Sequence, residues 1–348
     1  MADSGAPIGP ADTGFSQRPP LSRENNALTS AFIGPNGLRA GWRLLIAAAV
    51  FFVLTRCVGW ILSHFTHRAS GRVFSAFTPR GVLTGEALAF GLYLATAWIM
   101  SLIEARRFRD YGLGLRGAFA GGFWVSAAIG FASISLLLAA LRLAGVFHLG
   151  DPAIGGTLAW KDAGLWALAF LFVGFLEEDL FRGYLLFTLT TGIWFWPAAI
   201  VTSLAFGAVH LGNTGESYVG AAAAGGIGFF FCILIRKTGN LWAAIGFHMA
   251  WDWGETYFYG VPDSGLVASG HLFTAKFAGP VWLTGGTVGP EGSWFCLILI
   301  VLLCIGAAFV PGKKYPDPDA IPDPRRRRVE PVPTVLPETR GRFSESAI

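Results

Sequence analysis

Residues 177–182, Glu177-Glu178-Asp179-Leu180-Phe181-Arg182, place four ionisable side chains inside an otherwise apolar run of the chain. Residues 166–176 before them and residues 183–187 after them are almost wholly hydrophobic. A charged side chain at the centre of a bilayer costs about 2.5–3.5 kcal/mol on insertion scales. We therefore expect this stretch to be functional. The alternative is a helix that leaves the membrane here and exposes a solvated end.

The composition is that of a membrane protein. Hydrophobic residues make up 53% of the 348 residues, charged residues only 14%, and the mean hydropathy is +0.53. Soluble domains carry about 25% charged residues. Only helices or closed barrels satisfy the backbone in lipid, and the apolar runs here are long and continuous rather than alternating. The composition therefore predicts an all-α polytopic protein, and the cost of burying the charges of residues 177–182 predicts an intramembrane polar cavity among its helices.

The apolar runs divide the chain into a helical domain between two polar tails. Residues 1–38 and residues 312–348 are rich in Pro, and we expect both to be disordered. Residues 39–311 form the transmembrane domain. The expected transmembrane helices are eight in number and cover approximately residues 42–63, 82–104, 119–141, 163–189, 198–211, 217–235, 241–258 and 294–311.

Lys and Arg residues predict the orientation of these helices. With the amino terminus inside, 18 of the 26 Lys and Arg residues fall in inside segments and 6 in outside loops. Because positive charge accumulates on the cytoplasmic side, we expect both termini to lie in the cytoplasm. We expect the helical domain to lie in a bacterial plasma membrane. The pI near 9.0 then reflects basic flanks and a tail, including Arg325 to Arg328, that face anionic lipids, and no nucleic-acid partner is expected.

The cysteines offer no framework for a disulfide or a thiolate zinc site. All four lie in expected spans and no Cys-x-x-Cys occurs, so we expect small buried hydrophobic side chains. They are Cys57, Cys232, Cys296 and Cys304.

Helical spacing predicts different roles for the two adjacent glutamates in residues 177–182. Glu178 and Arg182 are four residues apart, the spacing of an ion pair on one helix face. Glu177 lies about 100° around the helix and has no such partner. One carboxylate is thus neutralised, while its desolvated neighbour is left to act as a general base.

Two further spans carry histidines at the same spacing from a neighbour. Phe206 precedes His210 by four residues, and His248 precedes Asp252 by four residues. Ionisable residues in membrane helices are functional by default. A Glu and two His from three spans can activate water, hold a metal ion or relay protons.

The three motifs Glu-Glu-x-x-x-Arg, Phe-x-x-x-His and His-x-x-x-Asp, each on its own span, resemble those of the CPBP family. This family comprises the type II CaaX prenyl proteases and the bacteriocin-processing or self-immunity (Abi-like) proteins. An Arg-rich link that ends in Gly112-Leu-Gly-Leu115 is also similar to the segment before the family core. The resemblance covers approximately residues 105–258.

The resemblance implies an intramembrane endopeptidase. Glu177 would activate water together with His210, and His248 and Asp252 would stabilise the oxyanion or complete a metal site. Glu178 and Arg182 would hold this constellation, and Phe206 would pack under His210. Asp252 stands where some relatives have Asn. Family members are described both as metalloproteases and as metal-free glutamate-dependent enzymes, so zinc on Glu177, His210 and His248 is one alternative.

The expected substrate is a membrane-associated or prenylated (CaaX-type) protein or peptide. A proton-coupled transporter that uses the same residues as a relay is the first alternative, although no internal repeat supports it. A non-catalytic immunity or binding protein on the same fold is the second. Since the fourth span ends inside and the seventh begins inside, we expect the cavity to open toward the cytoplasm.

Overall fold

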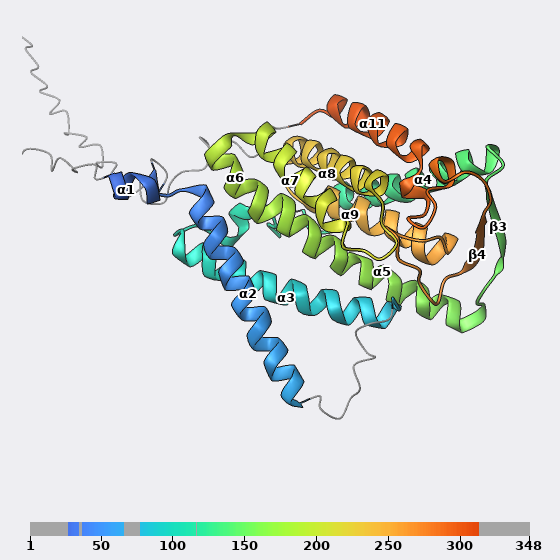
Figure 1. Cartoon of the computed structure of the whole chain (residues 1–348), viewed down its shortest axis with the longest axis horizontal. Coiled ribbons are helices and arrows are strands. Elements are labelled where there is room, and N and C mark those ends of the chain that lie inside the picture. Colours follow the sequence, from blue (N-terminus) through green and yellow to red (C-terminus); the bar gives the residue numbers. More distant parts are fainter. Residues whose placement is uncertain (1–26, 35–36, 66–76, 116, 313–348) are drawn as a thin grey trace, which may run out of the picture.

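The computed structural model describes residues 27–34, 37–65, 77–115 and 117–312 (Figure 1). Most of both expected tails, residues 1–26 and 313–348, lies outside the described residues. The α-helices are α1 (Ala27–Phe32), α2 (Ala40–Phe65), α3 (Pro79–Ile103), α4 (Gly121–Leu143), α5 (Gly156–Glu178), α6 (Leu186–Ile193), α7 (Phe195–His210), α8 (Tyr218–Thr238), α9 (Trp242–Asp252), α10 (Val281–Thr284) and α11 (Trp294–Phe309). The π-helical segments are η2 (Asp179–Leu185) and η3 (Trp253–Tyr259), and the short 3₁₀ segments are η1 (Phe108–Tyr111) and η4 (Pro290–Gly292).

Strands are few and short. β1 (Ile33–Gly34) pairs antiparallel with β2 (Gly37–Leu38), and β3 (Phe147–Pro152) pairs antiparallel with β4 (Phe273–Phe277). In the second pair Phe147 lies opposite Phe277. The expectation of a mostly helical chain is therefore confirmed.

Among the described residues, four helices are long and apolar enough to cross a membrane. They cover Ala40–His64, Pro79–Ile103, Gly121–Leu143 and Tyr218–Thr238. The other four expected segments are also helical, but their length and composition do not establish them as spans, so eight spans are not confirmed. The buried share of residues rises from 6% in the α2 window to 56% in the α8 window. α2 therefore lies at the periphery of the bundle, and α8 near its centre.

Three helices begin at hydroxyl side chains that cap them. Each hydroxyl accepts a hydrogen bond from the backbone N–H three residues later, which satisfies one of the free donors of the first turn. The capping residues are Thr78 for α3, Ser217 for α8 and Ser293 for α11.

Close backbone packing between α4 and α9 positions the helix that carries His248. A Cβ atom on Gly130 would collide with the carbonyl oxygen of Phe247, and one on Gly246 with that of Phe123. Small residues allow this approach, as at helix interfaces in membranes generally.

We expect Gly246→Ala to lower the stability of the protein in detergent by about 1–3 kcal/mol, because the added methyl group overpacks this interface. Thermal unfolding measures the effect. Gly306→Ala is the matched control, since no atom lies within 4 Å of a Cβ at that position. Equal melting temperatures for the two variants would contradict the close packing of α4 on α9.

The two ends of the bundle carry different loops (Figure 1). At one end, called here the basic end, Arg43 pairs with Glu104 at 2.8 Å, and the Trp242 Nε1–H donates to the Gly114 carbonyl at 2.8 Å. At the other, called the sheet end, lie β3, β4 and residues 211–217 and 260–293. There the Asn213 side chain donates to the Ser264 carbonyl at 3.0 Å.

Candidate active site

The acidic stretch 177–182 spans the junction between α5 and η2. The helix widens from α to π geometry directly after Glu178, and it widens again after Asp252, where α9 passes into η3. Single π turns inside α-helices occur frequently at functional sites. Spacing in the sequence did not predict these two π segments, although both candidate acids directly precede one.

Glu178 connects two of the predicted motifs. Its Oε1 atom accepts a hydrogen bond from Arg182 Nη1 at 3.1 Å and lies 2.9 Å from His248 Nδ1. The side chains of Glu178 and Arg182 are both fully buried. The ion pair predicted from the i,i+4 spacing is therefore present, and its contact with the histidine of α9 is an addition that only the fold reveals.

Aromatic rings surround the Arg182 guanidinium group. Its Cζ atom lies 4.0 Å from the ring centroid of Phe206, and the rings of Phe206 and His210 are 4.6 Å apart. A Cβ atom on Gly228 would collide with Arg182 Nη2, so this glycine lets α8 pass close to the guanidinium in its present position. Phe206 thus packs under His210, as expected, and also contacts the buried cation.

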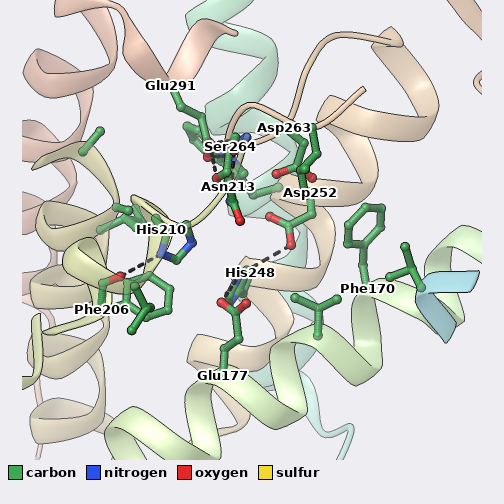
Figure 2. A pocket seen from close by; sticks show the side chains of 18 of the residues that line it. Phe170, Glu177, Phe206, His210, Asn213, His248, Asp252, Asp263, Ser264 and Glu291 are labelled. Carbon is green, nitrogen blue, oxygen red and sulfur yellow. Dashed lines mark hydrogen bonds and ion pairs between the residues drawn. The ribbon is translucent and has the colours of Figure 1, made fainter. Parts of the chain in front are cut away.

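The four candidate catalytic residues line one cavity of about 470 Å³ (Figure 2). They are Glu177, His210, His248 and Asp252. The Glu177 side chain is 29% exposed, in contrast to the fully buried Glu178. His248 Nε2 lies 3.7 Å from Glu177 Oε2 and 3.4 Å from Asp252 Oδ2. One carboxylate is thus accessible to water and the other is engaged in internal contacts.

The orientation of His210 follows from a backbone contact. Its Nδ1 atom lies 2.7 Å from the Phe206 carbonyl oxygen, and because a carbonyl only accepts hydrogen bonds, Nδ1 carries the proton. Nε2 is then the ring nitrogen left for the cavity. Within the described residues, no hydrogen bond or ion pair joins His210 to Glu177, so the two share the cavity without touching.

The arrangement does not fit the zinc set considered above. Zinc ligand atoms lie about 2.0–2.2 Å from the ion and therefore within about 4.4 Å of one another. In the described part of the chain, Glu177, His210 and His248 do not form a group whose donor atoms all lie within 4.8 Å.

The expectation that the cavity opens toward the cytoplasm stays a prediction, and the loops that line the cavity give its position in the bundle. Four of the lining residues belong to the loops of the sheet end, and they are Asn213, Asp263, Ser264 and Glu291 (Figure 2). The prediction placed the cavity near the end at which α9 begins. His248 and Asp252 lie two to three turns farther along this helix, toward the sheet end. His210 likewise ends α7 at the sheet end.

Several cavity residues were missed by the sequence analysis. Glu86 on α3 faces the same cavity as Glu177, and a lone acid inside an expected span was a signal for it. Asp263 and Glu291 lie in polar loops and carried no such signal. Asp179, in contrast, is buried away from the cavity lining, and its backbone carbonyl accepts a hydrogen bond from the Tyr93 hydroxyl at 2.8 Å.

The loops at the mouth of the cavity contain acids whose burial disfavours the charged form. Burial, together with the charge of Glu291, raises the pKa of Asp263 to about 7. Burial also raises the pKa of Glu216, against the opposing effect of a hydrogen bond from the Ser217 N–H. Both carboxyl groups therefore keep their protons to a higher pH than free Asp and Glu side chains do.

Comparison with known proteins agrees with this geometry. Residues 159–254 match the family model described as type II CAAX prenyl endopeptidase Rce1-like, a segment that holds all three motifs. No curated protein matches the chain significantly. The four apolar helices and this match together indicate an integral membrane protein. The chain carries an Rce1-like domain of the CPBP family, which confirms the predicted resemblance.

Proposed function

We propose that the protein is a glutamate-dependent intramembrane endopeptidase that hydrolyses a peptide bond in a membrane-associated protein or peptide. The observation that carries this proposal is the unequal environment of two adjacent acids. Glu178 is fully buried against Arg182 and His248, whereas Glu177 is partly exposed in the cavity. A partly desolvated carboxylate beside an imidazole is suited to act as a general base toward water.

In the proposed reaction, Glu177 accepts a proton from a water molecule as the water oxygen attacks the carbonyl carbon of the scissile bond. The carbonyl oxygen becomes an oxyanion in a tetrahedral intermediate. When the intermediate collapses, the C–N bond breaks, and the departing nitrogen takes the proton held by Glu177. The products are one new carboxylate and one new amine, and water is the only co-reactant.

The two histidines have complementary parts in this scheme. His210 is held by the Phe206 carbonyl, so its Nε2 can accept a hydrogen bond from the attacking water. His248 is held through Nδ1 by Glu178, and its Nε2–H can donate to the oxyanion when the ring carries both protons. Asp252, 3.4 Å from that nitrogen, acts as a positioning residue for the ring.

The charge of the cavity favours a basic substrate segment. Five carboxylates line it, from Glu86, Glu177, Asp252, Asp263 and Glu291, and no Lys or Arg is among its described lining residues. The basic end is inside by the distribution of Lys and Arg, so the sheet-end mouth faces outward in the proposed topology. This favours a membrane-anchored peptide on the outer side over a prenylated cytoplasmic C-terminus.

The direct test is cleavage of fluorogenic peptides by the purified protein in detergent or liposomes. Two matched series carry either Lys or Glu next to the scissile bond, and we expect faster cleavage of the Lys series. Serine- and cysteine-directed reagents should trap no acyl-enzyme. Absence of cleavage in all substrates, prenylated ones included, would instead support the non-catalytic alternative.

The topology makes a separate prediction for cysteine labelling. In a background that lacks the four native cysteines, Val267→Cys at the sheet end should react with a membrane-impermeant maleimide in intact cells. Leu115→Cys at the basic end should react only after permeabilisation. Both positions are highly exposed, at 74% and 84%, so access is decided by the side of the membrane. The reverse pattern would place the cavity mouth in the cytoplasm and restore a prenylated C-terminus as the favoured substrate.

A further inference from the structure

Three acids from separate segments converge beside the mouth of the cavity. Glu255 belongs to η3, Asp263 to the loop that follows it, and Glu291 to η4 before α11. One carboxylate oxygen from each lies within 4.8 Å of the other two. Three oxygens with this spacing all lie within about 2.8 Å of a common point, so small side-chain movements bring all three to the Ca²⁺–oxygen distance of roughly 2.3–2.6 Å.

Glu255 provides a second and independent observation. It is completely buried, and neither of its carboxyl oxygens has a hydrogen-bond partner among the described residues. Buried polar groups in folded proteins nearly always have a partner, and an unpaired buried carboxylate is strongly unfavourable. The unpartnered oxygens of Glu255 lie on the side where the other two carboxylates converge.

The remaining two acids are already held in place by hydrogen bonds. Glu291 Oε1 accepts from Trp251 Nε1 at 3.0 Å, and Oε2 accepts from the Ser264 hydroxyl at 2.7 Å. Asp263 Oδ2 accepts from the Thr256 hydroxyl at 2.7 Å. No Lys, Arg or His within the described ranges forms an ion pair with any of the three acids. The group thus combines a fixed geometry with carboxyl groups that have no basic partner among the described residues.

We propose that Glu255, Asp263 and Glu291 bind a hard divalent cation, and that this cation is Ca²⁺. The ligands are all oxygen atoms, which suit Ca²⁺ and Mg²⁺ rather than zinc or copper. Ca²⁺ accepts irregular sets of six to eight oxygens, as a group drawn from three segments provides, whereas Mg²⁺ demands near-ideal octahedral geometry. This site is distinct from Glu177, His210 and His248.

The cation would fasten the mouth of the cavity. Asp263 and Glu291 line the cavity from two different segments (Figure 2). Glu255 follows Asp252 on the next turn of the same helix. A shared ion therefore ties the loop after η3 and the start of α11 to the helix that carries His248. One consequence is that inhibition of the proposed peptidase by a chelator would not by itself identify a catalytic metal.

The first test is thermal unfolding of the full-length protein in detergent, with EDTA, with Ca²⁺ or with Mg²⁺. We expect saturating Ca²⁺ to raise Tm by at least about 3 °C over EDTA and to do so more than equal Mg²⁺. Glu255→Gln and Glu291→Gln should lose this shift. Glu86→Gln, which removes a carboxylate of the same cavity outside the group, should retain it.

The second test uses Tb³⁺, which replaces Ca²⁺ in oxygen-rich sites and emits when a nearby Trp is excited. Because the Trp251 indole donates to Glu291, wild-type protein should give sensitised emission that Ca²⁺ displaces. Trp251→Phe should lose the emission and keep the Ca²⁺-dependent shift in Tm.

Absence of both the shift and the emission in wild type, or their persistence in Glu255→Gln, would overturn the site. Equal stabilisation by Mg²⁺ would overturn the assignment to Ca²⁺. If Glu255→Gln does not fold, the cation site is tested by the thermal shift of Glu291→Gln and by the displacement of Tb³⁺ from wild-type protein. None of these measurements uses a peptide substrate, so the result stands whether or not the proposed peptidase activity is found.

Discussion

Glu177→Gln is expected to lower kcat for peptide hydrolysis by about a thousandfold or more while leaving the fold intact. General-base catalysis typically contributes 10²–10⁴-fold, and a glutamine of the same shape cannot accept the proton from water. The Glu177 side chain is 29% exposed, and its ion-pair partner, His248 Nε2, is 3.7 Å away. The substitution should therefore cost the fold little stability. Initial rates with a fluorogenic peptide, together with Tm in detergent, measure the two effects.

Glu86→Gln is the matched control, because it removes a carboxylate from the same cavity but from the opposite helix α3. We expect it to change kcat by less than about tenfold and to act mainly on KM for basic peptides, through the weaker charge of the cavity. If Glu177→Gln retains activity within tenfold of wild type, or if the two variants lose activity equally, Glu177 is not the general base.

Arg182→Ala is expected to destabilise the protein by about 3–5 kcal/mol, because it leaves Glu178 buried without its cation. The pair is 3.1 Å long and neither side chain is exposed. The substitution also removes the guanidinium from its position 4.0 Å over the Phe206 ring, which supports His210. Thermal or denaturant unfolding in detergent measures the loss, with the exposed Arg142→Ala as a control of equal charge change.

The double variant Arg182→Ala with Glu178→Gln separates a buried ion pair from simple loss of packing. Removing the orphaned charge should recover part of the stability that Arg182→Ala alone has lost. Activity should not recover, because Glu178 also holds His248 Nδ1 at 2.9 Å. A double variant no more stable than the single one would contradict the pairing.

The helices and their order were predictable from local sequence. Hydrophobicity summed over about 20 residues is a strong signal, and the eight expected segments are helical even where length and composition leave membrane crossing unestablished. The Glu178–Arg182 pair was predictable for a similar reason, since the i,i+4 spacing fixes which side chains share a helix face. Charged residues within apolar runs also identified the candidate site, because their burial is costly.

The contacts that Glu178 makes with other helices depend on the fold. The spacing identified one partner for Glu178, but its second, His248, comes from a helix 70 residues away along the chain. The π segments after Glu178 and Asp252 depend on how α5 and α9 pack, because an extra residue in a turn is accommodated by tertiary contacts rather than by local propensity.

The sequence alone therefore determined the helical segments, the apolar character of a membrane protein and the candidate site residues, all of which depend on hydrophobicity and on spacing along one helix. Only the tertiary structure decided the end at which the cavity opens, the separation of His210 from Glu177, and the convergence of Glu255, Asp263 and Glu291. These features depend on loops that bring distant segments together, and loop packing leaves no periodic signal in a sequence.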